Sequence, residues 1–315
     1  MDMDKCDLCG SAEHSVVYTT PDAAPEGAGS FQIVECNMCG LGFISPKIDL
    51  PELFDFYYHG YYDWLETADH EDRMKAEAAY LPPVTAFKHT PRLLDIGSGM
   101  GSFALHMIEH GWEVECVEPI CPIEIKGLHV HRNYLTELDE TAGPFDAATA
   151  WAVLEHVPNP KAYFQKVAEL LKPGGTFVFL VTNYDSLSSK RLFQEDIPRH
   201  CTFFTRKTVE SYLHAVGMEL VSVDFDDKIF SMGSRGALNY YFCRFILRRD
   251  YEREDYPASY PRFLEANGMR RGVLSASCFA ITHPISLLDR FFEPVIDRWQ
   301  KFTRTYGIAT YVARK

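Results

Sequence analysis

The feature that most constrains this chain of 315 residues is a short apolar run that ends in three alternating glycines. The run covers residues 93–96, the glycines stand at positions 97, 99 and 101, and residues 102–110 have the apolar spacing of a helix. Glycine allows positive φ angles and removes the Cβ atoms that would keep a ligand at a distance. The first N–H groups of a helix have no partner within the helix, so they can face a ligand at this turn. The segment therefore predicts a strand, a turn and a helix that bind a nucleotide-like ligand.

The spacing of the glycines differs from the dinucleotide-binding fingerprint G-x-G-x-x-G, because position 102 is Ser102. The pattern here is G-x-G-x-G, and Asp95 precedes it at the end of the strand. A second strand is expected over residues 112–118, and it ends at Glu118. In a doubly wound sheet, an acid about 20 residues past the glycine turn can bind both ribose hydroxyls. Glu118 is therefore the predicted ribose ligand.

Alternating strand and helix patterns continue from residue 92 to residue 225, which is typical of βαβ units and a mostly parallel sheet. Asn159 is the expected N-cap of one helix, and Pro160 is its first residue. Strands are predicted over 92–96, 112–118, 128–132, 145–153, 176–182, 219–225 and 308–313, and helices over 102–110, 160–171 and 205–214.

These motifs resemble those of class I S-adenosylmethionine-dependent methyltransferases. The resemblance rests on strand-D-x-G-x-G-x-G, on the segment F-D-A-A-T-A-W-A-V-L-E-H-V at 145–157, and on L-L-K-P-G-G at 170–175. It implies a Rossmann-like, mostly parallel seven-stranded sheet with helices on both faces, and S-adenosylmethionine as the cofactor. Asp95 and the backbone of the turn would then face the methionine part of the cofactor. The cofactor contacts implied in this region are Asp95, Gly97, Ser98, Gly99, Gly101, Glu118, Pro119, Ala150 and Trp151.

Two histidines are candidates for catalysis. The resemblance places His156, in the L-E-H-V motif, at the wall of the site. His200 begins a His-x-x-x-Phe-Thr segment, which faces the acceptor in family members with this layout. Histidine has an unperturbed pKa of about 6.5 and can act as a base at neutral pH, which methyl transfer needs only if an acceptor hydroxyl must lose a proton. The alternative for both residues is a structural role in packing or in hydrogen bonds to the backbone.

Two cysteine pairs of identical form precede the core. The sequence C-x-x-C-G occurs at Cys6 and Cys9 and again at Cys36 and Cys39. Two such pairs can place four thiolates around one tetrahedral zinc ion, and the glycine permits the tight turn. Four cysteines leave no open position on the metal, so the predicted site is structural. The odd total of nine cysteines, with no secretion signal, favours thiols and metal ligands over disulfides.

Residues 54–64 are dense in aromatic side chains. Crowded aromatics usually pack against one another. Methyltransferases similar to this chain, however, often carry a tyrosine-rich segment that closes over the cofactor, and aromatic faces attract a sulfonium as they attract other cations. Tyr57, Tyr61 and Tyr62 are therefore candidates for a lid, with plain packing as the alternative.

Residues 229–306 are an insertion before the last strand. Apolar residues at helical spacing between 287 and 302 indicate core packing or a subunit contact, as in a homodimer, with a lipid surface or a hydrophobic substrate as the alternative. Charges of both signs between 289 and 301 give no net basic face, which argues against the lipid surface. The expected division is a zinc-ribbon-like lobe at 1–45, an aromatic and helical lid segment at 46–91, a methyltransferase core at 92–228 and 307–315, and a helical insertion at 229–306 that serves as a substrate lid or oligomer contact.

Charge and hydropathy exclude several classes of function. Lys and Arg number 31 against 44 Asp and Glu, and the net charge of −13 would repel a phosphate backbone, so no nucleic-acid partner is expected. No apolar stretch approaches about 18 residues, which excludes a predicted transmembrane segment. The N-terminus lacks a basic region followed by an apolar run, and a cytoplasmic protein is therefore expected.

The expected function is methyl transfer to a small molecule. Zinc-ribbon-bearing members of the family that this chain resembles act in sugar, glycan and natural-product pathways, so the resemblance implies a hydroxyl of such a molecule as the acceptor. One alternative is a methyltransferase of proteins or other macromolecules, in which the zinc-ribbon-like lobe would bind the macromolecular substrate. Another is a non-catalytic module that binds the cofactor. A dehydrogenase is disfavoured because Ser102 breaks its fingerprint.

Overall fold

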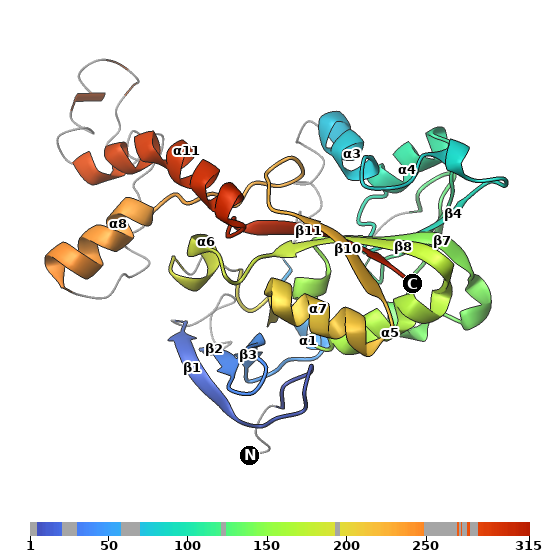
Figure 1. Cartoon of the computed structure of the whole chain (residues 1–315), viewed down its shortest axis with the longest axis horizontal. Coiled ribbons are helices and arrows are strands. Elements are labelled where there is room, and N and C mark those ends of the chain that lie inside the picture. The colour runs from blue at the N-terminus through green and yellow to red at the C-terminus, as the bar shows by residue number, and fades with distance from the viewer. Residues whose placement is uncertain are drawn as a thin grey trace. The chain divides into compact units, whose positions relative to one another are not determined.

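The computed structural model describes residues 5–20, 30–57, 70–120, 124–192, 196–248, 270, 272, 276–277 and 283–315 (Figure 1). The chain divides into two compact units. The core unit comprises residues 1–184, 196–231 and 308–315, and the insertion unit comprises 185–195 and 232–307. Each unit is described by itself below.

A seven-stranded sheet forms the centre of the core unit. Its strand order is β10-β11-β8-β7-β4-β5-β6, with β11 antiparallel to both neighbours and every other neighbouring pair parallel. The prediction of a mostly parallel seven-stranded sheet is therefore confirmed. The strands are β4 (Arg92–Ile96), β5 (Glu113–Val117), β6 (His129–His131), β7 (Phe145–Trp151), β8 (Leu171–Thr182), β10 (Glu219–Asp224) and β11 (Ile308–Arg314).

Helices cover both faces of this sheet because its central strands are apolar on both sides. On one face, Phe103 and Met107 of α4 pack with Leu93 and Trp112. On the other face, Phe164 of α5 stacks on Tyr212 of α7. Figure 1 shows α4 and α7 on opposite sides of the strands. The helices are α3 (His70–Ala78), α4 (Ser102–Glu109), α5 (Pro160–Leu170) and α7 (Arg206–Ala215), with 3₁₀ turns η1 (Val84–Ala86), η2 (Leu135–Glu137), η3 (Glu140–Ala142) and η4 (Leu154–His156).

The start of α5 differs from the prediction. Asn159 precedes Pro160 as expected, but its side chain makes no capping hydrogen bond. The carboxylate of Asp7, from the N-terminal lobe, accepts the hydrogen bond from Lys161 N instead. The helix also ends at Leu170, because Leu171 already pairs with Phe145 in the sheet.

A second, antiparallel sheet forms the N-terminal lobe. Its strands are β1 (His14–Thr19), β2 (Gln32–Cys36) and β3 (Gly42–Ser45), and helix α1 (Leu50–Phe54) follows them. The fourth strand, β9 (Thr202–Phe203), comes from the loop before α7 and pairs with β3. Ile44 N donates to Cys201 O at 3.1 Å, next to that pairing. The lobe therefore holds the segment that contains His200.

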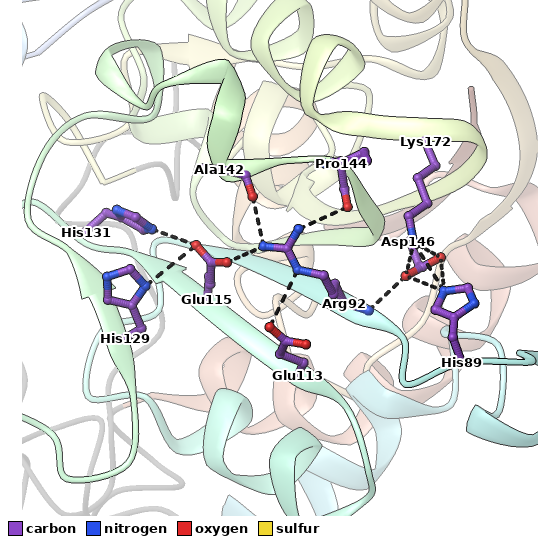
Figure 2. A network of polar contacts seen from close by, with 10 residues as sticks. All are labelled: His89, Arg92, Glu113, Glu115, His129, His131, Ala142, Pro144, Asp146 and Lys172. Atoms are coloured by element: carbon purple, nitrogen blue, oxygen red, sulfur yellow. Dashed lines mark hydrogen bonds and ion pairs between the residues drawn. The ribbon is translucent and has the colours of Figure 1, made fainter.

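A polar network joins the starts of β4 and β7 to the edge of the sheet (Figure 2). Arg92 forms an ion pair with Glu115 and donates to Ala142 O at 2.8 Å. Glu115 also accepts from His131 Nε2 at 2.8 Å. At the start of β7, Asp146 accepts from Lys172 Nζ at 2.8 Å. Because Arg92 and Asp146 stand at the starts of their strands, the network stabilises the end of the sheet opposite to the glycine turn.

The described part of the insertion unit is helical. Helices α6 (Leu187–Lys190) and α8 (Ala237–Tyr241) precede a π-helix at Phe242–Leu247 and the long helix α11 (Pro284–Thr303). Helix α11 packs against α8 (Figure 1). No helix among the described residues is long and apolar enough to cross a membrane.

Candidate functional site

The glycine turn after β4 has the conformation that its sequence predicts. Gly97, Gly99 and Gly101 have φ angles of 68°, 54° and 75°. A Cβ atom on Gly97 would lie inside the contact distance of Val153, and one on Gly101 would do the same with Leu128. The turn therefore requires glycine for its backbone angles and, at two positions, also for space. Strand β4 lies between β5 and β7, so this turn is at the switch point where ligands bind to open α/β sheets.

Glu118 lies at the end of β5 and faces the turn. Its Oε2 atom accepts a hydrogen bond from Gly99 N at 2.9 Å, and its Oε1 atom accepts one from Ile120 N at 3.2 Å. The side chain is fixed by these bonds and is 5% exposed. A carboxylate held in this place at the end of the second strand fits a ribose.

Asp95 lies beneath the turn. It is buried, and its Oδ1 atom accepts a hydrogen bond from Thr149 Oγ1 at 2.8 Å. The pKa of Asp95 is raised to about 7, chiefly by burial and also by the nearby charge of Glu118, although the hydrogen bond from Thr149 opposes the shift. Asp95 is therefore placed to shape the turn and its electrostatics from below.

A cavity of about 480 Å³ opens at this end of the sheet, a size suited to a small-molecule ligand. Eight residues that the sequence predicted for the site line it: Tyr57, Gly97, Gly99, Glu118, Pro119, Trp151, His156 and His200. Four others, Asp95, Ser98, Gly101 and Ala150, are not among the described residues that line it. Tyr61 and Tyr62 lie outside the described residues.

The two candidate histidines lie side by side in this cavity. The ring centroids of His156 and His200 are 4.6 Å apart. His156 Nδ1 lies 3.0 Å from Arg199 O and 3.2 Å from Tyr57 Oη. Because a carbonyl oxygen only accepts, Nδ1 carries the proton and leaves Nε2 as an acceptor. Burial, followed by the neighbouring His200, lowers the pKa of His156 well below its usual value, so His156 is neutral at physiological pH.

The two histidines, together with the buried Glu155 next to His156 in the chain, form the donor set of a cation site. Glu155, His156 and His200 each offer one ligand atom, and these atoms lie within 4.8 Å of one another. Two imidazoles and a carboxylate suit a divalent transition metal. The histidines can therefore serve either as a base or as ligands.

The four cysteines of the N-terminal lobe also converge. Their sulfur atoms lie within 4.8 Å of one another, with Sγ to Sγ distances of 3.5 Å for Cys6 to Cys39 and for Cys9 to Cys36. Gly10 and Gly40, which follow the two pairs, have φ angles of 75° and 80°. The donor set and the turns fit one tetrahedral zinc ion.

Phe54 and Arg199 line the cavity and were not predicted from the sequence as site residues. Phe54 and Tyr134 stack with a ring distance of 6.1 Å, and the guanidinium of Arg199 lies over the ring of Tyr57 at 5.3 Å. The aromatic density near residue 54 and the position of Arg199 beside His200 were available signals. Ala152 has a φ of 55°, a strained angle for alanine that the sequence does not indicate.

Two polar atoms near the turn suggest room for a ligand. Trp151 Nε1 and Ser98 Oγ are buried and have no hydrogen-bond partner among the described residues. Buried donors of this kind are normally satisfied, by protein, water or ligand. Together with the glycine turn and Glu118, they fit a cofactor that carries polar groups.

Comparisons with known proteins agree with this geometry. The family whose model matches the chain is described as a methyltransferase domain, and the match covers residues 67–223. The ubiquinone biosynthesis O-methyltransferase of Escherichia fergusonii is 32% identical over 108 residues, which are 31% of this chain and 45% of that protein. The protein of the same name from Xanthomonas axonopodis is 34% identical over 122 residues, which are 35% of this chain and 48% of that protein. The chain thus spans about half the length of these curated relatives.

Among solved structures, a similar one is an S-adenosylmethionine-dependent methyltransferase from Archaeoglobus fulgidus, with 18% identity, a TM-score of 0.45, and coverage of 81% of this chain and 100% of that chain. The fold class predicted from the sequence is confirmed by the family match and by the seven-stranded sheet. Residues 67–223 accordingly match a methyltransferase domain and lie within a Rossmann-like methyltransferase fold.

Proposed function

We propose that this chain binds S-adenosylmethionine and methylates a hydroxyl group of a small molecule. The observation that carries the proposal is that one cavity is lined both by the glycine turn with Glu118 and by the pair His156 and His200. The first group suits a nucleoside, and the second suits an acceptor that must lose a proton.

The cofactor would be held by residues at the ends of three neighbouring strands. Glu118 would bind the ribose hydroxyls, Gly97 and Gly99 would let the ligand approach the backbone, and Trp151 would offer its indole N–H. Pro119 lines the same wall, and Tyr57 offers an aromatic face to the sulfonium. Asp95 would act through the turn above it rather than by contact. Ser98, Gly101, Ala150, Tyr61 and Tyr62 remain predictions from the resemblance.

When bound, the cofactor supplies an electrophilic methyl group for an in-line displacement. The protein's contribution is to orient the acceptor and exclude water. His200 is the proposed base for the acceptor hydroxyl. His156, held by Arg199 O and Tyr57, would position the ring of His200, 4.6 Å away.

The acceptor class rests on two supports. The curated relatives are named O-methyltransferases, which favours oxygen over carbon or nitrogen. The aromatic side chains Phe54, Tyr57 and Tyr134 favour a flat or ring-shaped acceptor. We propose a sugar, a glycan precursor or a ring-bearing natural product.

We also propose one structural zinc ion on Cys6, Cys9, Cys36 and Cys39. The convergence of their sulfurs and the positive φ angles of Gly10 and Gly40 support it. A closed set of four thiolates would supply folding energy to the lobe. The expected chain divisions at 1–45, 46–91, 92–228 with 307–315, and 229–306 remain a proposal, as do the lid role of 46–91 and a homodimer.

The proposal is tested by thermal shift and by transfer of labelled methyl groups. With S-adenosylhomocysteine present, the chain is heated with nucleotide sugars, free sugars and phenols, and each hit is then assayed for turnover. His200→Gln should lower turnover about 100-fold or more while cofactor affinity stays unchanged. His214→Gln, on the exposed face of α7, is the matched control.

Other outcomes separate the alternatives. Label in precipitable material would indicate a macromolecular acceptor. Cofactor binding without turnover on any acceptor would indicate a binding module. Activity that is lost with a chelator and restored by a divalent cation, while the zinc of the lobe is retained, would assign Glu155, His156 and His200 to metal binding.

A further inference from the structure

Helix α11 of the insertion unit turns its acidic side chains inward. Asp289 is buried, and its carboxylate accepts hydrogen bonds from Gly236 N at 2.6 Å and Leu238 N at 2.8 Å. About two turns further along the helix, Asp297 Oδ1 accepts from Ser234 N at 2.8 Å and from Ser234 Oγ at 2.7 Å. Asp289 therefore caps the start of α8, where free N–H groups attract negative charge, and Asp297 binds the segment just before that helix.

The opposite face of α11 is apolar and exposed. Phe302 is 87% exposed, Phe291 73% and Trp299 63%. At 3.6 residues per turn, the exposed apolar positions occupy one arc of about 140°, with Arg298 inside one edge of the arc and Arg290 about 60° beyond that edge. The exposed apolar residues are Leu287, Leu288, Phe291, Phe292, Val295, Trp299 and Phe302, with Phe245, Ile246 and Leu247 on the π-helix.

The exposed charges on these helices are all basic. Across α8, the π-helix and α11, all described, the exposed charged residues are Arg244, Arg248, Arg290, Arg298 and the C-cap Arg304. The sequence argument counted Asp289 and Asp297 among the charges of this face, but hydrogen bonds to backbone and serine hold both side chains on the inner side. A basic, aromatic face stands out on a chain whose net charge is −13.

We propose that this face of the insertion unit binds peripherally to an anionic lipid surface. Large apolar side chains can enter the interface between headgroups and acyl chains, and each nearby arginine adds attraction to anionic headgroups. A second copy of the chain fits less well, because a twofold contact would bury the arginines of both copies in one interface, and the exposed charged residues of these helices include no acid to pair with them. The inference does not depend on methyl transfer, and its failure would leave that proposal intact.

Co-sedimentation with vesicles tests the proposal on the full chain. The chain should bind vesicles of equimolar phosphatidylcholine and phosphatidylglycerol, bind phosphatidylcholine alone at least ten-fold more weakly, and lose affinity as salt rises. The triple variant Phe291→Ser, Trp299→Ser, Phe302→Ser should bind at least ten-fold more weakly. Val221→Ser, at an exposed apolar site on β10 of the core unit, is the matched control and should bind as wild type does.

A second variant covers the case in which the triple variant does not fold. Trp299→Phe keeps the face apolar, so it should still bind, but the blue shift of tryptophan emission that vesicles cause should disappear. Wild-type protein that stays in solution with both vesicle types would overturn the proposal. So would a dimer that dissociates in the triple variant, because the face would then belong to a second copy.

Discussion

The carboxylate of Asp7 accepts a hydrogen bond from the backbone N–H of Lys161 at 2.9 Å, although 154 positions separate the two residues. The same oxygen accepts from Tyr212 Oη at 2.9 Å. Asp7 stands between Cys6 and Cys9, so the first cysteine turn of the lobe caps helix α5 and contacts α7. The N-terminal lobe and the helices of the seven-stranded sheet thus share polar contacts that neither would satisfy alone.

We expect Asp7→Ala to destabilise the core unit by about 1–3 kcal/mol, because it removes a cap and leaves the buried hydroxyl of Tyr212 without its acceptor. Urea unfolding followed by circular dichroism measures the change. Asp139→Ala removes an exposed cap of the turn η3 and should cost less, about 0.5 kcal/mol. Equal losses in the two variants would contradict the role of Asp7.

Removal of the proposed zinc should affect the site as well as the lobe. Strand β3 holds β9, and Ile44 N binds Cys201 O, one residue after His200. Loss of the metal should therefore unfold the lobe and release the His200 loop. Cys36→Ser should lower zinc content from one ion per chain to near zero, measured by mass spectrometry, and lower turnover at least ten-fold. The control Cys243→Ala, a buried cysteine of the insertion unit, should keep the metal.

Gly97→Ala should weaken cofactor binding strongly, because its Cβ atom would meet Val153 in addition to the strain of a positive φ. Gly127→Ala is a matched control, since Gly127 has a φ of 89° but open space around its Cβ position. Isothermal titration with S-adenosylhomocysteine should show an affinity loss of about 100-fold for Gly97→Ala and little change for Gly127→Ala. Partial recovery in the double variant with Val153→Ala would confirm that the clash is the cause.

Asp95→Asn should separate stability from function. Burial raises the folded-state pKa of Asp95 to about 7, so the stability that this acid contributes at low pH is lost as pH rises through about 7. Asparagine cannot ionise, so at pH 8 the variant should be more stable than wild type by on the order of 1 kcal/mol or more, and the gain should shrink at pH 5. Cofactor affinity should fall, because the turn loses the charge beneath it. A stability difference that does not vary with pH would contradict this account.

Much of the fold could be predicted because its signals are local. Hydrophobic periodicity predicts the strand at 92–96 and the helix that follows it, and the glycines predict the turn with positive φ angles between them. Both signals come from residues that are neighbours in the sequence. The acid at Glu118 followed from its distance along the chain, and the structure places it 2.9 Å from Gly99 N. The C-x-x-C-G spacing likewise predicted the two tight turns that bring the cysteine pairs together.

Other features depended on contacts between distant segments. The sequence by itself determined the strand and helix pattern, the glycine turn and the cysteine turns, since these need only adjacent side chains and backbone preferences. Only the tertiary structure decided that Asp7 rather than Asn159 caps α5, that Asp95 lies under the turn, and that Asp289 faces inward while Arg290 faces out. A sequence lists charges and caps, but which partner each one meets is decided by the packing of segments far apart in the chain.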